Sequence, residues 1–271
     1  MKNPLSVNNN APIGIFDSGL GGLTVLKKIQ DILPNENYIY FGDTAHLPYG
    51  SKSHECIIDY SENIVNFLLN KGVKAIIIAC NSASSVAKTY LEDQCDIPIF
   101  EVISPAVKNA IQLTSNNRIG IIGTETTIQS KVYSQQISEF NQSIHIKEIA
   151  CPLFVPIIEE GLENNKFTCE VVKLYLTPMV ESAIDTLILG CTHYPIIKEQ
   201  LYNFLSNEIK FVTSDIPVAI SLKKYLETNQ KLNLNGSGEI EFYVSDGAEK
   251  FQNLGSKFLN NNINNIQLIQ L

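Results

Sequence analysis

Arginine is almost absent from this chain, since Arg118 is the only one among 271 residues. Proteins that recognise nucleic-acid bases, or that hold a ligand carboxylate in a fork of two hydrogen bonds, usually rely on arginine. The formal net charge of −8 also argues against general binding to nucleic acid or to acidic membranes. We therefore expect neither nucleic acid nor a membrane as a partner.

Closely spaced cysteines and long apolar runs are missing as well. No two of the six cysteines lie within five residues of each other, so there is no CxxC pair and we expect no metal. No apolar stretch approaches the ~20 residues that span a bilayer. Residues 1–10 carry one lysine, no apolar core and a run of asparagines, unlike a secretory leader. These features predict a cytoplasmic protein with reduced thiols.

Two cysteines follow short apolar runs. Residues 75–79 (AIIIA) precede Cys80, and residues 186–189 (TLIL) with Gly190 precede Cys191. Such runs are typical of strands buried on both faces of a parallel sheet, and open α/β sheets bind ligands at the carboxyl ends of their strands. A lone cysteine there is most often a small buried hydrophobe, but two in matching settings indicate a functional pair. A helix predicted from residue 82 places Cys80 near a helix amino terminus, which favours its thiolate.

The matching settings belong to an internal repeat. Gly14 and Gly120, each in the first strand of its half, are 106 residues apart, and Cys80 and Cys191 are 111 residues apart. Two similar βα units that face each other would bring equivalent strand ends together across one cleft. We therefore expect an α/β fold of two pseudosymmetric domains with mostly parallel sheets and the active site between them.

The order of the predicted elements suggests how each domain is built. Residues 1–104 would form the first domain and residues 105–216 the second. Residues 239–244 alternate as a strand should, and we expect the tail, residues 217–271, to return to the first domain. Asp17 and Ser18 follow the first predicted strand; the simpler interpretation is that one of them caps the next helix. Their place at a strand's carboxyl end also suits ligand binding.

The two thiols admit three kinds of chemistry. A nucleophilic Cys191 with His193 two residues away is one, but it leaves Cys80 without a task. A metal held by Cys80, Cys191 and His193 is a second, with unusual ligand spacing. The third is epimerisation of a carbon, in which one group removes a proton from one face and a similar group delivers a proton to the other. A quasi-twofold cleft supplies that geometry directly.

Four motifs carry a resemblance to a known family. They occur in the order residues 17–22 (DSGLGG), 79–84 (ACNSAS), 154–156 (FVP) with Glu159, and 190–195 (GCTHYP). Together they resemble the glutamate racemases, within the cofactor-independent aspartate/glutamate racemase superfamily. The similarity extends from about residue 12 to residue 246. It implies interconversion of L- and D-glutamate without a cofactor, supply of D-glutamate for peptidoglycan, and a homodimer.

The resemblance also implies roles for individual residues. Cys80 would deprotonate D-glutamate and Cys191 L-glutamate, assisted by Asp17, His193 and Glu159, with Glu160 as the alternative to Glu159. The substrate-binding residues would be Asp17, Ser18, Tyr49, Gly50, Asn81, Ser82, Thr124, Thr126, Thr192 and His193. His46 stands where many relatives have arginine. Because no motif contains arginine, backbone N–H groups and hydroxyls must bind the substrate carboxylates.

Two other functions stay open at this point. An aspartate racemase would share the motifs, because the choice of substrate depends on the depth of the pocket. A non-catalytic amino-acid-binding protein would use the same cleft without needing its thiols. Among the remaining cysteines, Cys56, Cys95 and Cys169 are expected to be partly buried and without function, whereas Cys151, which ends a predicted strand, is left unassigned.

Overall fold

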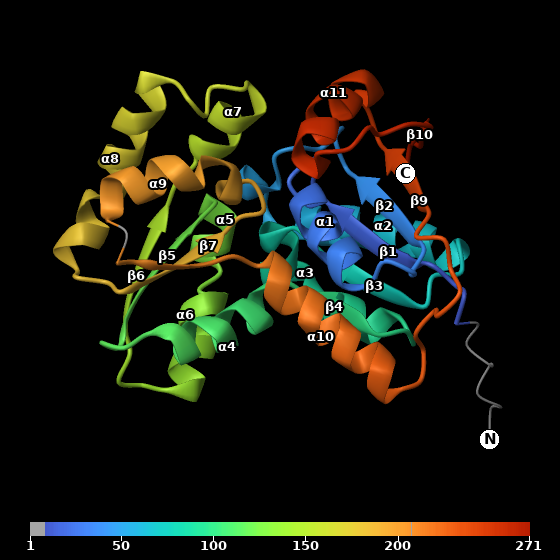
Figure 1. Ribbon diagram of the computed structural model, residues 1–271, viewed down its shortest axis with the longest axis horizontal. Helices are drawn as coiled ribbons and strands as arrows, with labels where there is room; N and C mark the ends of the chain where they lie inside the picture. The colour runs from blue at the N-terminus through green and yellow to red at the C-terminus, as the bar shows by residue number, and fades with distance from the viewer. Residues whose placement is uncertain (1–8, 207) are drawn as a thin grey trace.

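A computed structural model describes residues 9–206 and 208–271 (Figure 1). Residues 1–8 lie outside the described residues. The expectation that residues 1–10 are not a secretory leader therefore stays a prediction. Within the described ranges, no helix combines the length and the apolar character needed to cross a bilayer. The fold is α/β, as expected, and contains two sheets in which every strand pair is parallel.

The first sheet combines the beginning and the end of the chain. Its strand order is β10 (Ile266–Leu268), β9 (Ile240–Val244), β2 (Tyr38–Gly42), β1 (Ile13–Asp17), β3 (Ala75–Ile78) and β4 (Ile99–Glu101). Because β9 pairs with β2, the tail lies against the first half of the chain. The short strand β10 has no counterpart among the predicted elements.

The second sheet is formed by the middle of the chain. Its order is β6 (His145–Ala150), β5 (Arg118–Gly123), β7 (Thr186–Gly190) and β8 (Lys210–Val212). In both sheets the first strand of the half and the strand that precedes the cysteine are neighbours, since β1 pairs with β3 and β5 with β7. The domain boundaries expected near residues 104 and 216 stay a prediction.

Helices cover both faces of each sheet (Figure 1). On the first sheet, α1 (Leu23–Ile32), α10 (Asp215–Thr228) and α11 (Ala248–Leu259) pack on one face, and α2 (His54–Asn70) and α3 (Asn81–Gln94) on the other. Burial on both faces explains why the strand before each cysteine is entirely apolar or β-branched.

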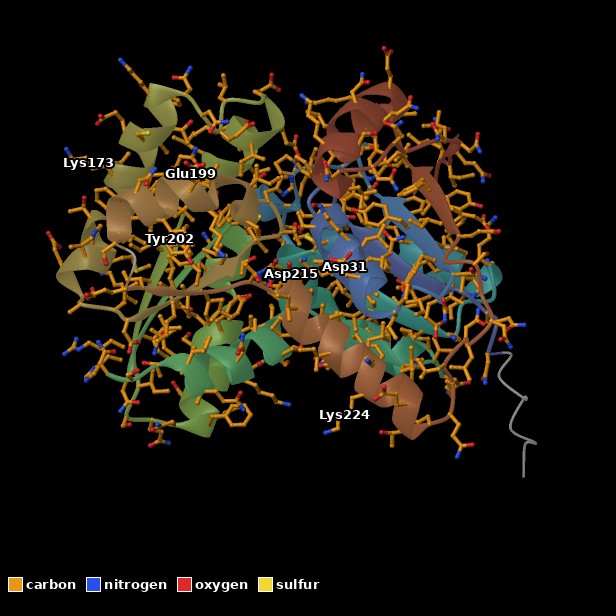
Figure 2. The ribbon with its side chains drawn as sticks, viewed as in Figure 1. Asp31, Lys173, Glu199, Tyr202, Asp215 and Lys224 are labelled. Carbon is orange, nitrogen blue, oxygen red and sulfur yellow. The ribbon has the colours of Figure 1, made fainter. Side chains whose placement is uncertain are left out.

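The second sheet is covered in the same way. One face packs against α7 (Phe154–Glu159), α8 (Lys166–Glu181) and α9 (Lys198–Leu205), and the other against α4 (Ile103–Leu113), α5 (Glu125–Gln129) and α6 (Val132–Phe140). Charged side chains such as Lys173 of α8 and Lys224 of α10 lie on the outer surfaces (Figure 2).

Prolines lie inside or at the start of helical segments in the second half. Helix α8 begins at Lys166 and continues through Pro178, which lies inside it. After Cys191 the chain first forms a 3₁₀ turn, Tyr194–Ile197, with Pro195 in its first positions, and only then α9. Proline is accepted there because an N–H in the first turn has no partner within the helix.

Candidate active site

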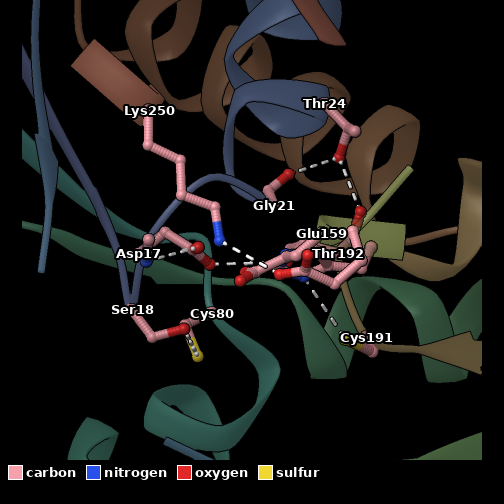
Figure 3. A network of polar contacts seen from close by, with 12 residues as sticks. Asp17, Ser18, Gly21, Thr24, Cys80, Glu159, Cys191, Thr192 and Lys250 are labelled. Carbon is pink, nitrogen blue, oxygen red and sulfur yellow. Dashed lines mark hydrogen bonds and ion pairs between the residues drawn. The ribbon is translucent and has the colours of Figure 1, made fainter. Parts of the chain in front are cut away.

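Cys80 lies between β3 and α3 and is 5% exposed. Its Sγ accepts a hydrogen bond from the Ala83 N–H at 3.5 Å and is 3.7 Å from the Ser18 hydroxyl (Figure 3). Burial and the negative charge of nearby Asp17 raise the pKa of the Cys80 thiol to about 12, against smaller opposite effects of Ala83 and Ser18. The Ala83 N–H at the start of α3 lowers the pKa, as expected of a helix amino terminus, but desolvation outweighs it, so the thiol and not the thiolate is favoured overall.

Cys191 follows β7 at the equivalent position of the second sheet and is 7% exposed. Its Sγ lies 3.9 Å from Nδ1 of His193, whose Nε2 is 3.2 Å from the Glu159 carboxylate. Burial disfavours the charge of His193, but its hydrogen bonds to Cys191 and Glu159, and their negative charges, together raise the pKa of His193 to about 10. The arrangement therefore favours an imidazolium beside Cys191.

The structure distinguishes the two neighbouring glutamates. Glu159 lies at the end of α7 with its side chain 10% exposed, and contacts His193. The Glu160 side chain is 67% exposed and instead contacts Lys250 of α11 at 3.5 Å. Glu159 is thus the one that contacts His193, whose other ring nitrogen faces Cys191.

Asp17 is the last residue of β1 and is completely buried. Its carboxylate accepts a hydrogen bond from the Gly19 N–H at 3.0 Å and lies 3.4 Å from the Thr192 hydroxyl (Figure 3). Helix α1 begins after Gly22 without a side-chain cap, so the interpretation of Asp17 or Ser18 as its cap is wrong. Burial raises the pKa of Asp17 although the positive charge of His193 opposes this effect.

A pocket with about 300 Å³ of empty space, its open mouth included, lies between these groups. Both cysteines line it. Its other lining residues are Ser18, Leu47, Pro48, Tyr49, Gly50, Asn81, Ser82, Thr124, Val155, Thr192 and His193. Ten of the thirteen sequence-predicted site residues are therefore brought together in one place. Asp17, Glu159 and Thr126 do not line the pocket: the first two lie behind it and contact lining residues.

Hydroxyl groups join the two halves at the pocket. Ser82 of α3 lies 2.9 Å from Thr124, the residue before α5, and Thr124 lies 3.0 Å from Thr127. The hydroxyl of Thr126 instead donates to the carbonyl of Tyr49 at 3.3 Å. Thr126 thus holds the loop that forms one wall, and its expected contact with a substrate stays a prediction.

The loop that follows β2 supplies three residues that sequence analysis did not assign or did not explain. Leu47 and Pro48 line the pocket, although only Tyr49 and Gly50 were expected there. His46 points elsewhere: its Nδ1 is 2.9 Å from the Asp43 carboxylate and its ring stacks on Tyr60 at 4.0 Å. The only sequence signal for Pro48 was its place beside the expected Tyr49, and no motif indicated Leu47.

The remaining cysteines lie away from the pocket. Cys56 and Cys95 are partly buried, as expected, but Cys169 is exposed because it lies on the outer side of α8. Cys151 follows β6, is fully buried, and its carbonyl accepts a hydrogen bond from the Tyr194 hydroxyl at 3.1 Å. Cys151 packs in the core of the second half and does not line the pocket.

Two parallel sheets, each with a cysteine after one central strand and both cysteines at one pocket, define an α/β protein with a paired-thiol site. The chain belongs to the Asp/Glu/hydantoin racemase family, whose model matches residues 13–213. It is 42% identical over 255 residues to glutamate racemase 3 of Caldanaerobacter subterraneus subsp. tengcongensis, covering 94% of this chain and 93% of that protein.

Solved structures of glutamate racemases have the same fold as this chain. Glutamate racemase from Francisella tularensis subsp. tularensis, solved in complex with D-glutamate, has a TM-score of 0.92 and 40% identity, with 97% of this chain and 98% of that chain covered. The glutamate racemase isoform RacE1 from Bacillus anthracis has a TM-score of 0.93 and 32% identity, with 97% and 99% covered.

Proposed function

We propose that this protein interconverts L- and D-glutamate by transferring protons between Cα and two thiols. The observation that carries the proposal is that Cys80 and Cys191 end equivalent strands of different sheets and line one pocket. A planar carbanion between them would be reached by one sulfur on each face. The names of the relatives reported above support glutamate as the substrate.

The surroundings of the thiols support different starting protonation states. The imidazolium of His193, held by Glu159, lies beside Cys191 and would interact favourably with negative charge on its sulfur during the reaction. Cys80 lies near the carboxylate of Asp17, and its raised pKa keeps its proton on sulfur at neutral pH. This state suits the conversion of L- to D-glutamate, with Cys191 as the base and Cys80 as the acid.

The proton transfers balance. The Cys191 thiolate takes the α-proton of L-glutamate and becomes a thiol, and the electron pair of the broken C–H bond stays on Cα. The Cys80 thiol then gives its proton to the opposite face of Cα and becomes a thiolate. D-Glutamate would bind to the protein in this second state, with Cys80 as the thiolate. Its conversion to L-glutamate would restore the thiol of Cys80 and the thiolate of Cys191. The carbanion must be stabilised by hydrogen-bond donors that are already in place around the pocket. The hydroxyls of Ser18, Ser82 and Thr192, which line the pocket, are the donors that we propose for this role.

We further propose that the D-glutamate serves peptidoglycan synthesis in the cytoplasm and that the protein acts as a homodimer without a cofactor. The resemblance of the four motifs to the glutamate racemases supports these finer points. Aspartate stays the alternative substrate, and binding without catalysis the alternative function.

The test is racemisation in heavy water with purified protein and no added cofactor. L-Glutamate and L-aspartate are supplied side by side, and chirality and deuterium at Cα are measured. Cys80→Ala and Cys191→Ala should each abolish turnover while the fold is retained. Cys151→Ala is the matched control, because this buried cysteine follows a strand but does not line the pocket. Normal turnover by either pocket variant would exclude the two-thiol mechanism.

A further inference from the structure

Tyr133 connects the chain segments that carry the two thiols. It lies on α6, is fully buried, and receives a hydrogen bond at 2.8 Å from Nδ2 of Asn81, the residue after Cys80. Its ring lies against Gly190, the residue before Cys191: a Cβ on Gly190 would be 3.2 Å from Cε2 of Tyr133. The proposed mechanism gives no role to this tyrosine.

The hydrogen bonds of Asn81 fix the orientation of its side-chain amide. Nδ2 donates to the Tyr133 hydroxyl and, at 3.2 Å, to the hydroxyl of Ser214, so both of its hydrogens are used. Oδ1 is buried and has no partner among the described residues. Asn81 lines the pocket and is 2% exposed. A buried acceptor without a partner costs free energy, and a ligand that supplies a donor would remove that cost.

Glutamate offers one such donor. At neutral pH both of its carboxylates are ionised and only accept hydrogen bonds, whereas its α-ammonium donates three. An unpartnered acceptor on a side chain that lines the pocket therefore suits the ammonium group, and the –NH₂ end of the same amide would repel it. The direction in which the Asn81 amide faces thus decides whether it attracts or repels the substrate.

We propose that Tyr133 is a positioning residue whose hydroxyl fixes the Asn81 amide with Oδ1 available to the α-ammonium of the substrate. Without that hydroxyl, Nδ2 keeps a single acceptor, Ser214, which can equally donate to Oδ1. The amide can then rotate by half a turn. This inference rests on the proposed function, because it concerns the binding of glutamate at the same site.

The test is Tyr133→Phe, which keeps the ring against Gly190 and removes only the oxygen. A contact with a charged group that is made equally in the ground and transition states changes KM more than kcat. We expect KM to rise about tenfold for both enantiomers, with kcat changed less. Tyr38→Phe is the control: Tyr38 is equally buried, its hydroxyl donates to the Leu33 carbonyl at 2.6 Å, and it does not line the pocket.

A double-mutant cycle separates positioning from a general loss of packing. In an Asn81→Ala background, Tyr133→Phe should leave KM unchanged, because no amide remains to orient; additive effects on KM would overturn the proposal. Ser214→Ala, which removes the second acceptor, should raise KM in the same direction and serves if Tyr133→Phe does not fold. Unchanged KM in either folded single variant would also overturn it. A wild-type protein that racemises no glutamate would instead refute the proposed function.

Discussion

Gly21 lies where the turn after β1 passes the residues that follow Cys191. A Cβ at this position would be 2.2 Å from Oγ1 of Thr192 and 2.5 Å from Nδ1 of His193, whereas ordinary contacts are 3.4–4 Å. Neither neighbour moves freely, because the Thr192 carbonyl accepts a hydrogen bond from Thr24 and His193 is held by Glu159. Gly21→Ala must therefore displace one of these side chains or separate the two halves.

The required displacement sets the expected size of the effect. Restoring ordinary contact needs a movement of roughly 1 Å, and a misplacement of about 1 Å at a reacting group can cost about 100-fold in rate. We expect kcat/KM to fall by about that factor in both directions, since the Cys191–His193 contact is disturbed whichever enantiomer reacts. The melting temperature should fall only modestly, because Gly21 lies in the turn between β1 and α1 and the apolar side chains of the cores are unchanged.

The assay follows racemisation of each enantiomer by circular dichroism and unfolding by heat on the same preparations. Gly14→Ala is the matched control: it lies in β1, the strand that precedes this turn, and the atoms nearest to its added Cβ would be in the side chains of Leu68 and Val73, at 3.1–3.3 Å. Its kcat/KM should stay near that of the wild type. A Gly21→Ala variant within threefold of the wild type (about 0.7 kcal/mol) would refute the reasoning that this close approach positions the site.

Three further predictions concern stability. The pKa of His193 is raised in the folded state to about 10, so its charge stabilises the fold fully below pH 6.5, and this stabilisation is lost as the pH rises through about 10. The free energy of unfolding, measured with urea, should therefore fall between pH 7 and pH 10.5, and it should fall by less in Glu159→Gln. The pKa of Asp17 is raised by burial, so the folded state loses stability as this carboxyl ionises. Asp17→Asn should therefore increase the free energy of unfolding at pH 7, measured by urea unfolding, while racemisation falls. Lys74 and Glu36 form a fully buried ion pair at 2.5 Å; Lys74→Met should destabilise the fold by about 3–5 kcal/mol, with kcat retained at temperatures where it is folded, and an unchanged melting temperature would contradict this.

The positions of the thiols could be predicted from the sequence because they depend on local patterns. A buried strand of four or five residues is visible as an apolar run, and the residue after it must lie at the carboxyl edge of the sheet. The repeated spacing then indicated that Cys80 and Cys191 lie at equivalent edges. The same patterns do not tell in which direction a side chain near the end of a helix points. Glu159 and Glu160 are adjacent in the sequence, and only the turn at the end of α7 decides which one contacts His193.

Other features depended on packing between distant segments. The entry of Leu47 and Val155 into the pocket follows from how a loop of the first half meets α7 of the second, which no spacing reveals. The net protonation of Cys80 was missed for a related reason. The helix amino terminus, which lowers its pKa, is visible in the sequence, whereas burial beside Asp17, which raises the pKa by more, is a property of the folded chain.

The repeat also explains why two equivalent thiols have unlike surroundings. A shift of 106 residues places Gly123, the last residue of β5, where the first half has Asp17 at the end of β1. A shift of 111 residues places Ser82 where the second half has His193. Each half thus carries one charged group that the other lacks, negative near Cys80 and positive beside Cys191. Both sulfurs follow equivalent strands of the two sheets, and in the proposed mechanism these two departures from the repeat would separate a proton donor from a proton acceptor.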